Sequence, residues 1–265
     1  MRAIDHPYCH SPFIVLAHRG GAGMAVNKGI ENTLAAFSHA VEVGCTYLET
    51  DVHATSDGVL VAFHDPILDR VTESSGVIAA MPWHKVKQAK VGGDEPIPTL
   101  DEILDAFPEA FINIDIKHDG ATMPLVDVLS RHRAWHRVCV GSFSSRRIQT
   151  FRRLVPERTA TAVGPVGVGW AIVGPHSMQR AQSRGDAYQV PHRLTRYGVP
   201  LVTPTFIDAA HRLGRAVHVW TIDEISEARE LMDMGVDGIV TDHPDLMCEF
   251  ARVHQPKDAP TLIPR

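Results

Sequence analysis

The sequence contains few cysteines, and none of them has the spacing of a metal or redox motif. The four cysteines are Cys9, Cys45, Cys139 and Cys248. No two of them form a Cys-x-x-Cys pair, which excludes zinc-finger and thioredoxin-like sites. Scattered thiols of this kind are typical of proteins in a reducing compartment. We therefore expect free thiols and a cytoplasmic location.

The sequence also lacks a long apolar run and an excess of positive charge. The most apolar stretch, 159–174, is interrupted by glycine and proline and is shorter than the roughly 20 residues of a membrane-spanning helix. Residues 1–12 lack the apolar region of a secretory signal. The 26 Lys and Arg are outnumbered by 31 Asp and Glu, which argues against nucleic-acid binding and predicts at most weak membrane contact. We expect a small-molecule partner, and the sequence makes no prediction about oligomeric state.

Short segments rich in apolar and β-branched residues recur eight times along the chain and predict β-strands. They are 13–17, 46–52, 111–116, 138–142, 159–163, 187–190, 216–221 and 238–241. Amphipathic helical patterns lie between most of these segments, at 33–43, 99–107, 144–154, 204–213 and 225–234. Hydrophobic residues make up 44% of the chain, which is enough for a sizeable core.

This alternation of strands and helices predicts an α/β fold, a closed parallel TIM (β/α)8 barrel. A doubly wound open sheet is the alternative, but residues 20–23 lack the Gly-x-Gly-x-x-Gly spacing of a dinucleotide-binding loop. Residues 66–97 interrupt the alternation with a small, turn-rich insertion after the second strand. The predicted organisation is a single barrel domain over 13–250, followed by a C-terminal tail over 251–265.

Acidic side chains are concentrated on the second and third predicted strands, near the barrel end where active sites of this fold lie. Glu49, Asp51 and His53 alternate along the second strand and therefore share one face. Asp115 and Lys117 are placed in the same way on the third strand. Neighbouring carboxylates repel one another unless a cation compensates them, and hard divalent cations prefer oxygen ligands. Glu49, Asp51 and Asp115 are therefore candidate metal ligands.

Two histidines and two cations accompany the acidic cluster. His18 follows the first strand and His64 follows a short apolar run, so both are candidate general acids or bases. Arg19 and Lys117 are candidate ligands for a phosphate oxyanion. Glu31 either points into the same site or pairs with Arg19, and both roles are compatible with helix capping by the residues that follow it.

Ten short motifs extend over nearly the whole chain, from about residue 13 to 250. They are His18-Arg19-Gly20, Glu31-Asn32-Thr33, Glu49-x-Asp51, Asp57-Gly58, His64-Asp65, Pro98-Thr99-Leu100, Asp115-x-Lys117, Ser142-Phe143, Trp220-Thr221 and Thr241-Asp242-x-Pro244. In this order they resemble the glycerophosphodiester phosphodiesterase family. One motif of three residues has little specificity, whereas ten in register are highly specific.

The resemblance implies a TIM-barrel enzyme of lipid and glycerol metabolism that hydrolyses glycerophosphodiesters to sn-glycerol 3-phosphate and an alcohol. It also implies a divalent cation, Mg²⁺ or Ca²⁺, with Mn²⁺ as a third option. The implied roles are catalysis for His18 and His64, metal binding for Glu49, Asp51 and Asp115, and phosphate or substrate binding for Arg19, Lys117, Glu31, Phe143 and Trp220.

The sequence departs from the family pattern at two positions. The third strand of the family usually carries Glu where this chain has Asp115, which is one methylene shorter. We therefore expect Asp115 to reach the metal through water, or the metal to lie deeper. The residue before Glu31 is usually Pro, and here it is Ile30, after a loop lengthened by residues 24–29.

Other functions remain open at this stage. Barrels that resemble phospholipase D of the spider-venom type share the Glu-x-Asp motif and two histidines, but they are secreted, disulfide-bonded and as a rule lack the insertion; such an enzyme would cleave lysophospholipids. A non-catalytic barrel that binds phosphodiesters would be expected to have lost one of the catalytic groups. Within the enzyme itself, either the glycerol 2-hydroxyl or metal-bound water attacks phosphorus.

The apolar segment 162–174 has two interpretations. It is either a loop or helix start packed on the barrel, or an apolar lip in which Trp170 contacts a lipid-like leaving alcohol or a membrane surface.

Overall fold

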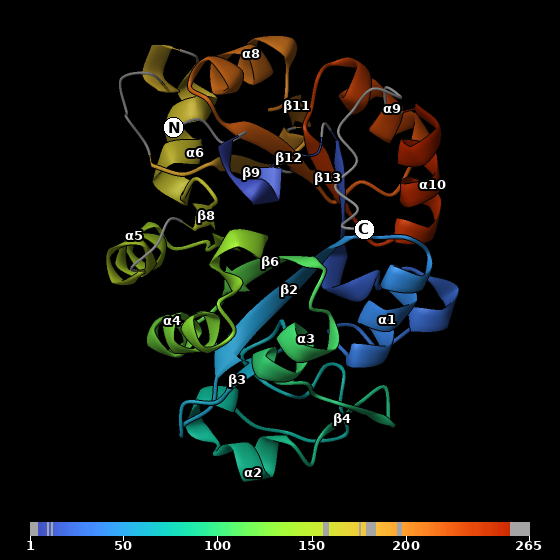
Figure 1. Cartoon of the computed structure of the whole chain (residues 1–265), viewed down its shortest axis with the longest axis vertical. Coiled ribbons are helices and arrows are strands. Elements are labelled where there is room, and N and C mark those ends of the chain that lie inside the picture. The colour runs from blue at the N-terminus through green and yellow to red at the C-terminus, as the bar shows by residue number, and fades with distance from the viewer. Residues whose placement is uncertain are drawn as a thin grey trace.

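Eight parallel strands form the centre of the protein in the computed structural model, which describes residues 5–9, 11, 13–155, 159–174, 176–178, 184–194 and 198–254 (Figure 1). The barrel strands are β1 (Ile14–Ala17), β2 (Tyr47–Ala54), β6 (Phe111–Ile116), β7 (Val138–Gly141), β8 (Ala160–Thr161), β9 (Ala187–Pro191), β12 (Ala216–Trp220) and β13 (Gly238–Thr241). They correspond one to one with the eight predicted strands, so the predicted TIM barrel is confirmed.

The order of hydrogen-bonded strands is β8-β7-β6-β2-β1-β13-β12-β9, and all these pairs are parallel. The ring closes between β8 and β9 through a single bridge, Ala162 to Ala187. Two backbone hydrogen bonds support this seam, from the Val163 amide to the Ala187 carbonyl at 2.7 Å and from the Asp186 amide to the Thr161 carbonyl at 2.6 Å. The other seven strand contacts are regular ladders.

Helices surround the barrel on its outside (Figure 1). They are α1 (Leu34–Glu42), α3 (Leu100–Ala106), α4 (Thr122–Arg131), α5 (Ser145–Leu154), α6 (Pro165–Val173), α8 (Pro204–Arg212), α9 (Ile225–Asp233) and α10 (Pro244–His254). Five match the predicted helical segments, and α4, α6 and α10 are additional. Since α10 continues to His254, the first four residues of the predicted tail belong to this helix, and 255–265 lie outside the described residues.

Two helix starts are fixed by side-chain caps. The Thr33 hydroxyl accepts a hydrogen bond from the Ala36 amide at the start of α1. Thr99 and Glu102 form a reciprocal capping box at the start of α3, which satisfies amide groups that the helix itself leaves free.

The insertion after β2 forms a small subdomain at the bottom of Figure 1. The chain turns back from β2 into β3 (Leu60–Ala62), which pairs with it antiparallel, and continues through α2 (Trp83–Val86) and the hairpin of β4 (Lys90–Val91) and β5 (Glu95–Pro96). The subdomain has its own apolar core, to which Leu68, Ile78 and Ile97 contribute. A second short hairpin, β10 (Arg193–Leu194) with β11 (Val199–Pro200), follows β9.

A short 3-10 turn near the N-terminus, Pro7–Cys9, packs into the core beside the barrel strands. Tyr8 is fully buried there, and its ring meets those of Tyr47 and Phe111 edge to face, with centroids 5.3 Å and 6.0 Å away. The Tyr47 hydroxyl donates a hydrogen bond to the Tyr8 carbonyl at 2.9 Å. In the described part of the chain, no helix has both the length and the apolar character needed to cross a bilayer.

Strand β6 illustrates how the barrel separates its core from its site. Ile112, Ile114 and Ile116 belong to the main apolar core with the helices. The alternating residues Asn113 and Asp115 line a pocket at the centre of the barrel. The period of two along a strand thus sends apolar side chains outward and polar ones inward.

Candidate active site

A pocket of about 540 Å³ opens at the carboxyl ends of the barrel strands. Nine of the ten predicted site residues line it: His18, Arg19, Glu49, Asp51, His64, Asp115, Lys117, Phe143 and Trp220. The tenth, Glu31, is not one of the lining residues and pairs instead with arginines beside the pocket. The structure therefore brings together side chains that are up to 202 residues apart in the sequence.

The turn after β1 brings His18 and Arg19 to the pocket. Arg19 adopts a left-handed backbone conformation, with φ of 51°, which non-glycine residues adopt rarely. Gly20 follows with φ of 85°, and a Cβ atom there would lie only 2.9 Å from Ala36 of α1. The small residue lets the turn pack against α1, while the Arg19 amide donates a hydrogen bond to Glu49 at 3.1 Å.

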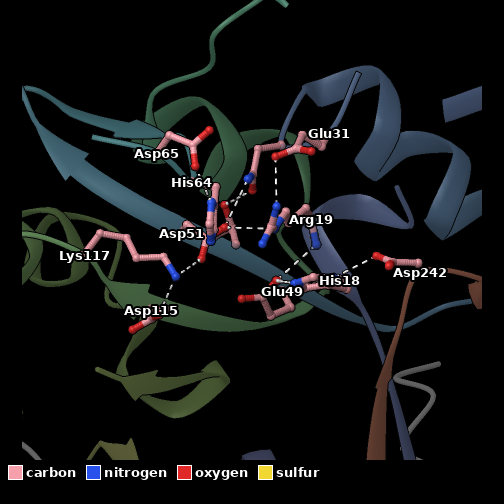
Figure 2. A network of polar contacts seen from close by, with 12 residues as sticks. His18, Arg19, Glu31, Glu49, Asp51, His64, Asp65, Asp115, Lys117 and Asp242 are labelled. Carbon is pink, nitrogen blue, oxygen red and sulfur yellow. Dashed lines mark hydrogen bonds and ion pairs between the residues drawn. The ribbon is translucent and has the colours of Figure 1, made fainter. Parts of the chain in front are cut away.

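Lys117 lies between two of the three buried carboxylates. Its Nζ atom is 2.8 Å from Asp51 Oδ1 and 2.8 Å from Asp115 Oδ2, and it enters from the left in Figure 2 while His18 and Arg19 enter from the right. Burial opposes ionisation of Asp51, but the charges of Lys117 and Arg19 outweigh it and lower the pKa of this carboxyl. Asp51 is therefore an anion at neutral pH.

Glu49 and Asp115 are buried carboxyl groups whose charge the surrounding protein does not fully compensate. Burial, reinforced by the charge of Asp51, raises the pKa of Glu49 to about 7. Burial also raises the pKa of Asp115, and its Oδ1 atom is buried without a hydrogen-bond partner. Oxygen donors in this state fit a hard divalent cation. Among the described residues, no three acidic, histidine or cysteine side chains are arranged as a preformed metal site, and the cation that bridges Asp51 and Asp115 is Lys117.

His18 is held by a carboxylate from the other end of the chain. Its Nδ1 atom is 2.7 Å from Asp242 Oδ1, and its Nε2 atom is 4.0 Å from Glu49 Oε2. Burial lowers the pKa of His18, but the hydrogen bond to Asp242 and the nearby acidic charges outweigh it, so the pKa is raised. Because a carboxylate only accepts, Nδ1 carries the proton and Nε2 is left to react on the pocket side.

His64 is held in the same manner by its sequence neighbour. Its Nδ1 atom is 2.7 Å from Asp65 Oδ1. Arg70 of the insertion binds Asp65 through Nε and binds Glu31 through both terminal nitrogens, at 3.0 Å and 2.6 Å. Glu31 in turn accepts a hydrogen bond from Arg19 at 3.0 Å. Arg70 thus connects Asp65, which holds His64, with Glu31, which holds Arg19.

The mouth of the pocket is apolar and aromatic. Phe143 meets Trp220 edge to face at 6.0 Å and lies beneath the Lys117 ammonium, 5.5 Å from its ring centroid. Val168 and Ile172 of α6 form an apolar wall. Segment 162–174, for which the alternatives are a loop or helix start packed on the barrel and an apolar lip, contains the helix α6, and Trp170 lies outside the catalytic pocket, in a neighbouring groove.

Several groups in or around the pocket are not among the predicted site residues. Gln189 lines the pocket and donates a hydrogen bond to Asn113 at 2.7 Å. Asn32 donates to Asp51 at 3.3 Å and accepts from Thr50 at 2.8 Å. Inward alternation on β6 and β9 would have indicated Asn113 and Gln189, whereas no local signal indicates Arg70.

Residues 18–246 match the model of the glycerophosphoryl diester phosphodiesterase family. The Mycobacterium tuberculosis protein named probable glycerophosphodiester phosphodiesterase 2 is 39% identical over 243 residues, which cover 90% of each chain. Human lysophospholipase D GDPD1 is 27% identical over 279 residues, covering 89% of this chain and 85% of the relative.

Solved structures have the same fold. The Oleispira antarctica phosphodiesterase, determined in complex with the product sn-glycerol-3-phosphate, is 25% identical with a TM-score of 0.76, covering 93% of this chain and 99% of that one. Glycerophosphodiester phosphodiesterase from Thermotoga maritima is 23% identical with a TM-score of 0.71, covering 89% and 97%. The match over nearly the whole chain settles the family: this chain is a member of the glycerophosphoryl diester phosphodiesterases, as predicted, and is a phosphoric diester hydrolase.

Proposed function

We propose that this enzyme hydrolyses glycerophosphodiesters to sn-glycerol 3-phosphate and an alcohol by histidine acid–base catalysis with a divalent cation. The observation that carries the proposal is the pair of histidines, each held at Nδ1 by a carboxylate 2.7 Å away, on the walls of one pocket. The product bound to the Oleispira antarctica relative supports the choice of substrate.

The two histidines move the protons of the reaction. One ring accepts at Nε2 the proton of the attacking hydroxyl, either the glycerol 2-hydroxyl or water. The other donates its Nε2 proton to the oxygen of the leaving alcohol. Asp242 and Asp65 keep the two imidazole rings oriented and stabilise their protonated forms, as the carboxylate beside a catalytic histidine does in other enzymes. Trapping a 1,2-cyclic phosphate under single-turnover conditions would identify the 2-hydroxyl as the nucleophile.

Cations bind and stabilise the phosphate. Lys117 and Arg19 are placed to neutralise the non-bridging oxygens, where charge grows in the transition state. Glu49, Asp51 and Asp115 would hold Mg²⁺, Ca²⁺ or Mn²⁺, and the metal would supply further positive charge beside the phosphate. The unpaired Asp115 Oδ1 and the raised pKa of Glu49 support this assignment. With such a cation bound to Asp51 and Asp115, the Lys117 ammonium would be available to the phosphate.

The test measures release of sn-glycerol 3-phosphate from glycerophosphocholine with and without EDTA. We expect EDTA to abolish turnover and Mg²⁺, Mn²⁺ or Ca²⁺ to restore it. Glu49→Gln and Asp51→Asn remove one charge each at constant volume and should lower kcat while the fold persists by circular dichroism. Full turnover in EDTA would contradict the metal, and absence of turnover with every metal would contradict the reaction.

Cleavage of lysophospholipids is a second candidate function. The apolar wall formed by Val168 and Ile172, in the same pocket as Phe143, favours an apolar group near the leaving alcohol, and a human relative is named lysophospholipase D GDPD1. The test compares glycerophosphocholine with lysophosphatidylcholine. Ile172→Ser should lower kcat/KM for the lysolipid by about 10-fold, the value of one lost apolar contact of this size, and leave the short diester unchanged. Equal effects on both substrates would exclude this function.

A further inference from the structure

The outer face of α6 is an apolar surface without polar side chains to cover it. Every residue of this helix is apolar or glycine. Val166, Trp170, Ile172 and Val173 are 63%, 48%, 48% and 70% exposed. A cluster of large exposed apolar side chains on a soluble domain marks a surface that meets a partner. We define the α6 surface as these four residues.

A strongly basic helix lies next to the α6 surface. Helix α5 carries four arginines and no acidic residue, in a chain whose formal net charge is −5. The two helices are in direct contact, because the Val166 amide donates a hydrogen bond to the Ser145 hydroxyl at 3.0 Å. They enclose a groove of about 420 Å³ lined by Arg152, Arg153, Arg184 and Trp170. Positive charge and apolar surface therefore meet along one groove.

Arg152 is the fixed member of this basic groove. Its Nε donates to the Thr161 hydroxyl at 2.9 Å and its Nη2 to the Ala162 carbonyl at 2.7 Å. Arg153 and Arg184 are exposed. The groove thus has one anchored guanidinium at its wall and two exposed arginine side chains that can reach an anion outside.

The α6 surface continues into the catalytic mouth. Val168 and Ile172 of the same helix line the active-site pocket, and Ile172 is also exposed at the surface. Phe143, 70% exposed, also lines this pocket and extends its apolar rim. A flat partner that covers the α6 surface would therefore also lie over the opening through which substrate enters.

We propose that α5 and α6 dock this enzyme on an anionic phospholipid surface, with the catalytic mouth facing the lipid. Tryptophan and aliphatic side chains next to arginines are typical of helices that lie in a membrane interface, where apolar groups enter the acyl boundary and cations bind lipid phosphates. A protein partner is disfavoured, because protein interfaces carry regular hydrogen bonds and the Trp170 indole is the one side-chain donor that α6 offers.

The test measures binding of the full chain to vesicles. We expect cosedimentation with phosphatidylcholine vesicles that contain phosphatidylglycerol, and much less with phosphatidylcholine alone or at high salt. Trp170→Asp with Val173→Asp should weaken binding by about 10-fold or more. Arg153→Glu with Arg184→Glu should weaken it by at least about 5-fold for each arginine and reduce its salt dependence. Val253→Asp on α10, across the barrel from α6 in Figure 1, is the matched control at an apolar position 60% exposed.

A second measurement avoids variants that introduce a new charge into the fold. Brominated phosphatidylglycerol should quench part of the tryptophan emission, and Trp170→Phe should remove most of this quenching while vesicle binding persists. Turnover of glycerophosphocholine without vesicles should be unchanged in the Trp170 and Val173 variants, because neither residue lines the catalytic pocket.

Three results would overturn the proposal. The first is equal binding to neutral and anionic vesicles. The second is a loss of vesicle binding in Val253→Asp as large as that in the α6 variants. The third is a concentration-dependent dimer that the α6 substitutions abolish, which would assign the surface to a second copy of the chain. Vesicle binding is measured without substrate turnover. If the proposed function failed, the result of the binding test would therefore still stand.

Discussion

His18 and His64 are held by equivalent contacts that come from different parts of the chain. Asp242 follows β13, whereas Asp65 is the next residue after His64. His18→Ala and His64→Ala should each lower kcat by roughly 10²–10⁴-fold, since each removes one proton transfer. The measurement is steady-state turnover of glycerophosphocholine, with His84→Ala, at an exposed histidine of α2, as the control. Wild-type kcat in either variant would contradict the role of that histidine.

Asp115 offers the clearest test of metal binding by a single residue. Its buried Oδ1 atom has no partner in the protein, so removal of the carboxyl should remove a ligand without breaking a second contact at that atom. Asp115→Ala should therefore weaken binding of Ca²⁺ or Mn²⁺ in calorimetric titrations, whereas Asp115→Glu should preserve or tighten it. If wild type and Asp115→Ala bind metal equally, Asp115 is not part of the metal's environment.

At the residue scale, the sequence predicts the reactive groups better than the groups that support them. His18, Glu49 and Asp115 follow from strand-end position and motif, and the structure brings them to one pocket. Arg70 does not, because its two partners lie 5 and 39 positions away and the loop between them has no regular pattern. An ion pair formed by a residue of an irregular segment has no periodic pattern in the sequence that could predict it.

The insertion is an element with its own core, and its packing supports the active site through Arg70. Ile78 is fully buried there, while its neighbour Val77 is 48% exposed. Ile78→Ala should lower the free energy of unfolding by about 2–5 kcal/mol, the usual range for a buried cavity, and reduce kcat/KM as the contacts of Arg70 loosen. The measurements are urea unfolding and turnover.

Val77→Ala is the matched control for this variant. A change at the exposed neighbour should stay within about 0.5 kcal/mol and leave turnover unchanged. Full activity in a destabilised Ile78→Ala would show that the insertion folds independently of catalysis.

At the element scale, strands were easier to predict than helices. The barrel strands are short apolar runs, so all eight were located. For the α6 segment the sequence predicts no more than a loop or a helix start, since Gly167 and Gly169 each disfavour a helix by roughly 1 kcal/mol. Pro165 at its first position and the contact of Ala171 with the barrel core favour it. Tertiary packing thus outweighs local propensity.

The barrel as a whole encloses an ionisable group in its interior. His218 on β12 is 1% exposed, and burial lowers its pKa to about 4. Between pH 6.5 and 4 the unfolded chain binds a proton at this position and the folded chain does not. The free energy of unfolding should therefore fall on acidification through this window, by up to about 3 kcal/mol.

Urea unfolding at pH 7 and pH 4.5 tests this expectation. His218→Gln keeps a polar side chain and removes the titration, so its loss of stability should be smaller than that of the wild type. Other groups titrate in both proteins and cancel in the comparison. If the free energy of unfolding falls equally in both proteins, the acid sensitivity arises from groups other than His218.

At the scale of the molecule, the number and order of strands suffice to predict the barrel and the place of the insertion. The turn at Pro7–Cys9 does not follow from the sequence, because a three-residue segment has no periodicity. Tyr8 is buried by aromatic partners from β2 and β6, far along the chain. Such packing is visible only once the strands are assembled.

The closure of the barrel between β8 and β9 has a kinetic consequence. Seven contacts of the ring are regular ladders, whereas this one is a single bridge with two backbone hydrogen bonds and one from the Thr161 amide to the Asp186 carboxylate at 3.0 Å. Amide hydrogens protected by so few bonds are released by local opening and do not require global unfolding. Deuterium should therefore enter at Thr161, Val163 and Asp186 well before it enters β6, and the ring should come apart there first, directly beneath α6.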